Sequence, residues 1–133
     1  MKIKIIDSEV VSLLVKPVND DVFEDENSLH FGFTPKFSEE ESRDYCIDFQ
    51  VNVVHKAGYR YEIEYRSHFS CDDVIDEQFK SSKFISVNSP AIAFPFLRAY
   101  VANLLLLSGH DPIMLPTINF VALADREGKS RSG

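Results

Sequence analysis

The stretch FPFLRAYVANLLLL, residues 94–107, decides how the rest of this chain must fold. Pro95 stands one residue inside its start and Gly109 just beyond its end, where these residues favour the beginning and the end of a helix. Between them, Arg98 and Asn103 are the clearly polar side chains. A helix that is apolar on every side must be buried on every side. One sheet covers only one side, so we expect a second copy of the chain to cover the other.

This helix is too short to cross a membrane. It spans about 21 Å at about 1.5 Å per residue, whereas a bilayer requires about 20 consecutive apolar residues. The opening residues MKIKIIDSEVV lack an apolar stretch of signal-peptide length and include Asp7 and Glu9. We therefore expect a cytoplasmic protein without membrane insertion.

The composition is typical of one globular domain of 133 residues, with 44% hydrophobic and 26% charged residues. A net charge of −7 argues against nucleic acid as a partner, because phosphate contacts need a basic surface. The two cysteines form no CxxC motif, and the histidines show no ligand spacing, so neither a disulfide scaffold nor a metal site is indicated. No cofactor is predicted.

Two runs, residues 45–53 and 59–69, alternate apolar and polar side chains, which predicts two half-buried strands. The loop between them ends in Gly58, typical of a three-residue hairpin connection with a left-handed glycine. This register pairs Val51 with Ile63 on the apolar face. On the polar face it sets Asp48 opposite Arg66, an attractive cross-strand pair.

The same register places Cys46 opposite His68. A cysteine–histidine pair can act as a nucleophile. On a solvated sheet face with no cleft implied, we interpret this pair as incidental. The sequence also lacks a phosphate-binding loop and a dinucleotide fingerprint. We therefore expect no enzyme and no catalytic residues.

The remaining segments complete a four-stranded sheet. Residues 3–15 form a long β-branched run, and residues 29–37 alternate, with Pro35 indicating an edge strand or strand end. The acidic residues 18–27 are interpreted as an exposed loop, and residues 72–79 as a short helical turn. Strands followed by helices define an α+β chain, and the short connections favour an antiparallel sheet.

Two motifs carry a resemblance to a known family. The segments PAIAFPFLR, residues 90–98, and LPTINFVAL, residues 115–123, resemble the P-x-I-x-F-P-[YF]-x-R and P-x-[VI]-N-F-x-A-L blocks of the SecB protein-export chaperones. The matching positions include Phe94, Pro95, Arg98, Asn119, Phe120 and Leu123. The resemblance implies a SecB-like fold in which a four-stranded antiparallel sheet precedes a long apolar helix and a second helix that here is truncated. We expect a single SecB-like domain over residues 1–124.

The resemblance also implies an assembly and a function. SecB-like chains form homo-oligomers, dimers of dimers with the long helices between the sheets. We therefore expect an interface, in a dimer or a tetramer, at Phe94, Leu97, Val101, Leu104 and Leu105. The family binds unfolded polypeptides, preproteins for export among them, in apolar grooves without ATP, and delivers some of them to the SecA translocation motor.

The expected peptide-binding side chains are aromatic and aliphatic, since such groups bury large areas without requiring one sequence. They are Phe23, Leu29, Phe31, Phe33, Phe120 and Leu123. Phe31 and Phe33 also fit an ordinary core. Phe23 stands alone among acids, which is hard to explain unless it docks on something. The surrounding acids are read as a solvated loop, with attraction of basic clients as the alternative.

The end of the chain departs from the family pattern. Residues 125–133 form a short segment that is polar and slightly basic. We expect this segment to be a disordered tail and the second helix to stop at Gly128. The family's acidic motor-docking tail is therefore not matched. Glu62 and Glu64 on the sheet are the candidate motor contacts. Asn119 is expected to cap the second helix, and Arg98 to pair with a carboxylate or carbonyl.

Two further functions stay open. The chain is alternatively a SecB-like partner dedicated to one client, such as an antitoxin of a toxin–antitoxin system. A more distant alternative is a small-molecule-binding module, which predicts a closed pocket within a stable monomer. Breadth of binding separates the first alternative from a general holdase chaperone.

Overall fold

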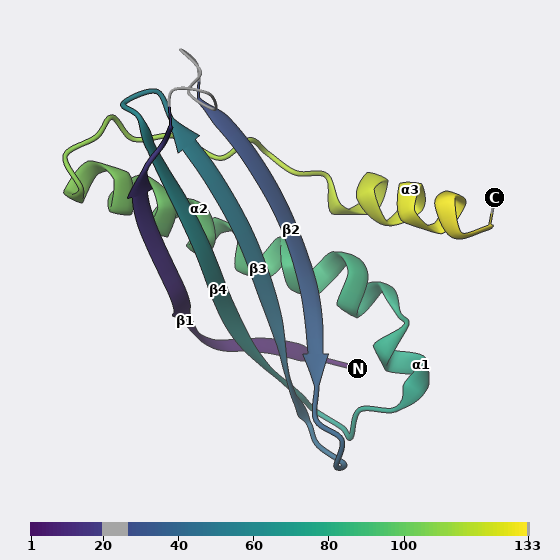
Figure 1. Ribbon diagram of the computed structural model, residues 1–133. Helices are drawn as coiled ribbons and strands as arrows, with labels where there is room; N and C mark the ends of the chain where they lie inside the picture. The colour runs from purple at the N-terminus through teal and green to yellow at the C-terminus, as the bar shows by residue number, and fades with distance from the viewer. Residues whose placement is uncertain (20–26, 133) are drawn as a thin grey trace.

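Four antiparallel strands form one sheet in the order β1-β4-β3-β2 (Figure 1). The computed structural model describes residues 1–19 and 27–132. The strands are β1 (Ile3–Pro17), β2 (Ser28–Phe37), β3 (Asp44–His55) and β4 (Tyr59–Cys71). The predicted four-stranded antiparallel sheet is confirmed, and β2 is an edge strand, as Pro35 indicated.

The β3–β4 hairpin has the predicted register, with Val51 opposite Ile63. Gly58 adopts a φ of 92° and its N–H donates to the carbonyl of His55 at 2.9 Å, which closes the three-residue turn. Arg66 donates two hydrogen bonds to the Asp48 carboxylate, at 2.7 and 3.0 Å. The alternation thus fixed both the fold of the hairpin and its cross-strand ion pair.

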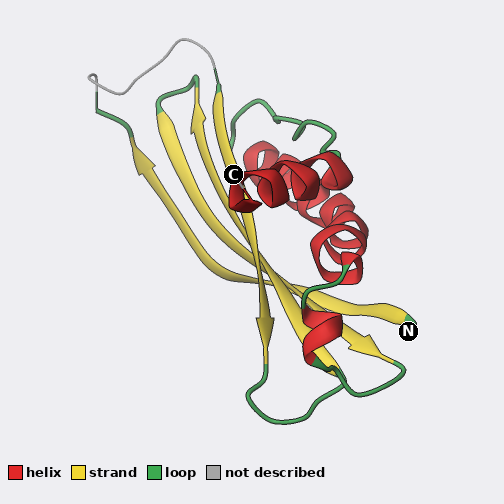
Figure 2. Ribbon diagram, turned by 90° about the vertical axis from the view of Figure 1, so that its right-hand side faces the viewer, coloured by secondary structure: helices red, strands yellow, loops and turns green. Residues whose placement is uncertain are grey.

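The helices lie together on one face of the sheet and leave the other face bare (Figure 2). They are α1 (Glu77–Lys80), the π-helical turn η1 (Phe84–Asn88), α2 (Ser89–Leu107) and α3 (Phe120–Ser132). Asp76 caps α1 by accepting from the Phe79 N–H at 2.8 Å. Helix α2 crosses the sheet, and α3 continues the helical layer past the β2 edge (Figure 1).

Helix α2 begins earlier than the sequence predicts. It starts at Ser89, with Pro90 in its first turn, so Pro95 lies inside the helix. A proline there leaves the carbonyl four residues earlier without its helical donor. That residue, Ala91, is exposed, so water can reach its carbonyl. At the other end, Gly109 adopts a φ of 86°, the left-handed conformation expected after the helix.

The helix is longer than predicted, so the prediction that it is too short to cross a membrane is wrong. Together η1 and α2 form a helix of 24 residues, Phe84–Leu107, with a mean hydropathy of 1.6 over an 18-residue window. By length and composition alone such a helix can cross a membrane. In this fold a third of that window is buried against the protein. The length of this helix therefore does not exclude a membrane span.

The core lies between the inner face of the sheet and α2. Its fully buried side chains include Phe49, Tyr61 and Phe69 from the central strands and Leu97 from α2. The hydroxyl of Tyr45 joins the two layers through Ser89, at 2.6 Å. Burial of these apolar surfaces is the main stabilising contribution of the fold.

The second helix differs from its prediction at one end. Asn119 caps it as expected, since its Oδ1 accepts from the Ala122 N–H at 3.0 Å. The helix does not stop at Gly128 but continues to Ser132. Glycine costs about 1 kcal/mol in a helix but does not interrupt the hydrogen bonds as proline does. The backbone of the expected tail is thus helical up to Ser132.

The expected pairing of Arg98 with a carboxylate or carbonyl is not seen at its Nε in the described part of the chain. Its side chain is half-buried, and its buried Nε has no hydrogen-bond partner within the described part of the chain.

Candidate functional site

Five phenylalanine rings from four elements gather at the β2 side of the sheet. The ring of Phe31 lies 5.5 Å from that of Phe94 and 6.4 Å from that of Phe120, between centroids. The ring of Phe33 lies 5.8 Å from that of Phe120 and 6.3 Å from that of Phe49. We call these five residues, Phe31, Phe33, Phe49, Phe94 and Phe120, the aromatic cluster.

The local sequence explains how the cluster forms. Phe31 and Phe33 are two residues apart in β2, so both point to the helical face of the sheet. The Asn119 cap begins α3, so that Phe120 reaches the two rings as the first residue of that helix. Its ring meets Phe33 and Phe94 edge to face, at 75° and 74°. Such pairs contribute about 0.5–1.5 kcal/mol each beyond the buried area.

The structure brings together three of the six side chains expected to bind peptide: Phe31, Phe33 and Phe120. Leu29 and Leu123 are half-buried and pack against the hydrophobic core. Leu29 shares the inner face of β2 with Phe31, and Leu123 stands one helical turn after Phe120. Phe23 lies outside the described residues. Phe49 was not among the predicted site residues, although the alternation in β3 predicted that it faces inward.

The cluster borders a free strand edge. Phe120 is buried, whereas Phe31 and Phe33 are half-buried. Strand β2 ends the sheet and pairs with β3 alone within the described chain, so its outer edge presents N–H and C=O groups. An extended peptide can add a strand to such an edge while its side chains contact the aromatic rings.

The predicted oligomer interface requires a correction. Phe94, Leu97, Val101 and Leu105 are at most 6% exposed and lie in the core of the single chain, against the sheet. Only Leu104 is half-buried. Because α2 is apolar on all sides, its sequence does not reveal which side faces the sheet. The four buried side chains are not available to a second copy.

A different stripe of α2 is exposed. Ile92, Phe96 and Leu106 are 38%, 52% and 57% exposed, and they continue through the exposed Ala99 and Asn103. The intervals of four, three, four and three residues place all five on one side of the helix, as in helix pairs. We call these five residues the α2 stripe. The sequence did not predict this stripe, because apolar residues occur on every side of α2.

The other edge strand, β1, also exposes apolar side chains. They are Ile6, Val10, Val11, Leu13, Leu14 and Val15, each between 41% and 56% exposed. A long apolar edge strand that is left uncovered is prone to pair with another chain. The exposed apolar surface of this protein is therefore not limited to α2.

Glu62 and Glu64, the candidate motor contacts, lie on the bare outer face of β4. Glu64 is exposed, whereas Glu62 lies 3.8 Å from the Lys16 ammonium group across the β1–β4 pairing. Exposed pairs of this kind contribute little, about 0–1 kcal/mol. The two carboxylates are therefore accessible, but Lys16 partly offsets the charge of one.

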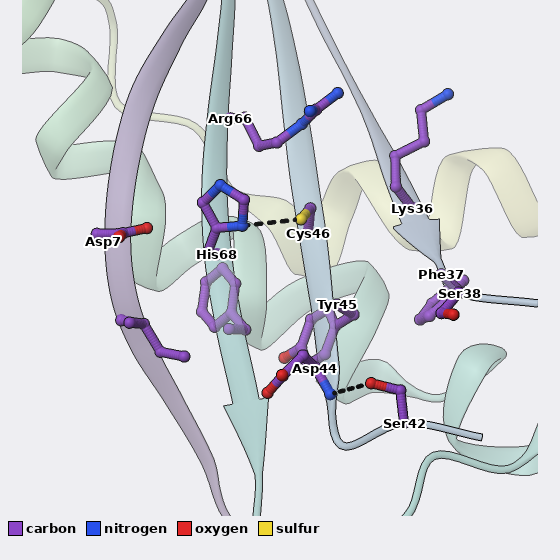
Figure 3. Close-up of a pocket in the computed structure, with 12 residues that line it drawn as sticks. Asp7, Lys36, Phe37, Ser38, Ser42, Asp44, Tyr45, Cys46, Arg66 and His68 are labelled. Atoms are coloured by element: carbon purple, nitrogen blue, oxygen red, sulfur yellow. Dashed lines mark hydrogen bonds between the residues drawn. The ribbon is translucent and has the colours of Figure 1, made fainter. Parts of the chain in front are cut away.

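Cys46 and His68 do face each other on this outer face, as the register indicated. The Cys46 Sγ lies 3.2 Å from His68 Nδ1 (Figure 3). We expected no cleft on this face, but the two residues border a shallow pocket of about 650 Å³. Among the described residues, no cluster of three or more histidine, cysteine or acidic side chains is arranged to hold a metal ion.

Comparison with known proteins defines the family. The family model for preprotein translocase subunit SecB matches residues 12–131. The chain therefore belongs to the SecB family. It is 27% identical over 105 residues to the protein-export protein SecB of Magnetococcus marinus, covering 75% of this chain and 66% of that protein. It is 32% identical over 88 residues to the SecB of Anaplasma phagocytophilum, covering 62% of this chain and 56% of the relative.

The chain thus spans about two thirds of the length of the first of these relatives and just over half of the length of the second. Two solved structures share its fold. One is a SecB-like chaperone of Mycobacterium tuberculosis in complex with a ChAD peptide from the HigA1 antitoxin, with a TM-score of 0.68, 12% identity and coverage of 88% and 90%. The other is a protein of unknown function from Streptococcus agalactiae, with a TM-score of 0.54, 10% identity and coverage of 88% and 98%.

Proposed function

We propose that this protein is an ATP-independent holdase chaperone that binds unfolded polypeptides, preproteins for export among them. The observation that carries the proposal is the aromatic cluster beside the free edge of β2. Membership of the SecB family supports it. In this function the protein holds its client and catalyses no reaction.

The two parts of the site match what an unfolded chain exposes. Its unpaired backbone groups bond to the outer edge of β2, and its apolar side chains bury against Phe31, Phe33 and the neighbouring Leu29. Rings accept many apolar shapes, because they bury area without demanding one sequence. Backbone pairing is likewise independent of side-chain identity. Together they give broad selectivity.

The test is an aggregation assay without nucleotide. A chemically unfolded protein is diluted out of denaturant, and the suppression of its aggregation is measured. Phe33→Ala is expected to weaken client binding by about tenfold, because loss of one aromatic contact costs about 1–2 kcal/mol. Phe37→Ala is the matched control. Phe37 lies on the same face of β2 but contacts Tyr45 and Lys80 rather than Phe120. Thermal unfolding of both variants shows whether the fold is retained.

Wild-type protein that suppresses aggregation, with a loss confined to Phe33→Ala, supports the proposal. No suppression by the wild type overturns it. Equal losses in both folded variants overturn the assignment of the client to the aromatic cluster.

We further propose that the protein is a homo-oligomer in which copies meet through the α2 stripe. The stripe is apolar apart from Asn103, and a solvated helix face of this composition is unfavourable in water. Mass in solution by light scattering distinguishes a dimer or tetramer from a monomer. A second copy that covers the stripe would also make the helix formed by η1 and α2 a core helix of the oligomer and not a membrane span. This is consistent with a cytoplasmic protein, which we propose.

A dedicated role for one client is the second candidate. The M. tuberculosis structure, which shares the fold, contains a peptide from an antitoxin. If this chain serves one such client, it binds that client tightly and leaves unrelated unfolded proteins to aggregate. Suppression of aggregation for several unrelated proteins favours the holdase role.

Contact with the SecA motor through Glu62 and Glu64 is proposed as part of the export role. It is supported by the family assignment and by the exposed Glu64 on the bare face of the sheet. The double variant Glu62→Lys with Glu64→Lys is expected to weaken SecA binding while client binding is retained.

A further inference from the structure

Three neighbouring strands place a thiol, an imidazole and a carboxylate in line on the outer face of the sheet. Cys46 of β3 lies 3.2 Å from His68 Nδ1 of β4 (Figure 3). His68 Nε2 lies in turn 2.9 Å from Glu9 Oε1 of β1. A bulge at Ile6 brings Glu9 to this face, because one inserted residue reverses the side of the residues that follow, here as far as a second irregularity after Val10.

The protonation of this row follows from what each group can do. A carboxylate only accepts hydrogen bonds, so His68 Nε2 must carry the proton that is donated to Glu9. In the neutral imidazole, Nδ1 is then an acceptor. The Cys46 thiol donates to it. The arrangement is a nucleophile, a base and a group that orients the base, within hydrogen-bond reach.

Burial raises the pKa of the Cys46 thiol, while the neighbouring Arg66 guanidinium opposes this effect. At neutral pH the side chain is therefore a thiol that needs a base in order to react. Once deprotonated, a thiol of higher pKa is the stronger nucleophile. His68 Nδ1 is positioned to take the proton.

The surroundings favour one kind of reaction. Acyl transfer needs free N–H donors for an oxyanion. Strands β3 and β4 have a neighbour on both sides, so their N–H groups are used in the sheet. Thiol–disulfide exchange needs only a thiolate and open access to a sulfur. The pocket of about 650 Å³ beside Cys46 provides that access and space for a small adduct.

We propose that Cys46, with His68 as its base and Glu9 as a positioning residue, is a modification site that forms a mixed disulfide with small cationic disulfides. The Cys46 proton moves to His68 Nδ1 as Sγ bonds to one sulfur of the disulfide. The disulfide bond breaks, and the departing sulfur takes its electron pair and then the proton from His68. The products are a mixed disulfide on Cys46 and one free small thiol.

The preference for a cationic reagent follows from the charges around the pocket. Arg66 is held by Asp48, and His68 by Glu9. Of the other charged residues that line the pocket, Asp7 and Asp44 are acidic and Lys36 is basic. This leaves an excess of negative charge, and the whole chain carries −7. Such a field attracts cations, and salt screens it.

The experiment follows mixed-disulfide formation by intact mass and peptide mapping, with cystamine as the cationic and glutathione disulfide as the anionic probe. Cystamine is expected to react several-fold faster, with a smaller difference at high salt. His68→Gln is expected to slow the reaction by about tenfold or more. Glu9→Gln slows it less and shifts the midpoint of the pH–rate profile.

The second cysteine provides the matched control. Cys71 is 7% exposed, and burial raises its pKa also. Cys71→Ser is expected to leave the rate unchanged and Cys46→Ser to abolish the adduct. A rate unaltered by His68→Gln in folded protein, or equal modification of Cys71, overturns the proposed site. Faster reaction with glutathione disulfide overturns the proposed class of reagent. The readout is independent of client binding, so it does not depend on the proposed function.

Discussion

The hydroxyl of Tyr45 lies 2.6 Å from the Oγ of Ser89, in the core between sheet and helix. Ser89 Oγ donates its one proton to the Phe84 carbonyl at 2.5 Å, so Tyr45 must be the donor to Ser89. This chain of two hydrogen bonds ties β3 to the junction of η1 and α2. It holds the helix that carries both Phe94 of the aromatic cluster and the α2 stripe.

Removing the Tyr45 hydroxyl tests that connection. Tyr45→Phe is expected to lower the free energy of unfolding by about 1–2 kcal/mol, the usual effect of losing a buried hydrogen bond. Chemical denaturation measures it. Tyr59→Phe, at a residue that is 37% exposed, is the control and is expected to change little.

The same residue predicts a dependence on alkaline pH. Burial is the largest cause that raises the pKa of Tyr45 from 10.0 to about 12 in the folded protein. Below pH 10 the phenol is neutral in both states, so its contribution to stability is complete. Between about pH 10 and 12 the unfolded chain ionises first, and up to about 3 kcal/mol is lost. Tyr45→Phe is expected to show a shallower decline across this range, and an unchanged slope would contradict the account.

The Asp48–Arg66 pair is expected to contribute more than other charge pairs. Asp48 is buried and accepts two hydrogen bonds from Arg66, whereas Glu62 and Lys16 are 3.8 Å apart and exposed. Asp48→Asn is expected to cost about 2 kcal/mol of stability. The matched change Glu62→Gln is expected to cost at most about 0.5 kcal/mol. Equal losses in denaturant titrations would show that the bidentate geometry contributes nothing.

Two adjacent residues of α2 test which way the helix faces. Leu97→Ala opens a cavity in the core and is expected to cost about 2–5 kcal/mol of stability. Phe96→Asp leaves the core intact but places a charge in the α2 stripe, so it is expected to convert the oligomer into a smaller species. Light scattering measures the second effect. Val74→Asp, at another exposed apolar residue, is the control. Unchanged mass for Phe96→Asp would rule out the stripe as the interface.

Sequence alone predicted the sheet well, because its information is local. The alternation of residues 45–53 and 59–69 and the turn at Gly58 determined the hairpin register, including the facing Cys46 and His68. The Asn119 cap was equally local. An alternation of period two indicates which face of a strand is buried. The register is well determined, because a shift of one residue would move every side chain of the strand to the opposite face.

The rest depended on tertiary packing. An all-apolar helix contains no signal for its rotation, so Leu97 and Val101 were assigned to a partner although they contact the sheet. The start of α2 was misplaced because Pro95 was taken as the proline of the first turn, whereas Pro90 holds that position. Glu9 lies on the same face as Cys46 and His68 only because of the bulge at Ile6. The periodicity of the sequence does not predict this bulge.

Photo-crosslinking to an unfolded client tests the central claim most directly. A photoreactive residue is placed at Leu29, on the inner face of β2, and in a second variant at Glu62, on the outer face of the sheet. If the client lies on the β2 edge and the aromatic cluster, position 29 forms crosslinks that an excess of unlabelled client suppresses, and position 62 forms none. Equal crosslinking at both positions, or crosslinking at position 62 alone, would contradict the account.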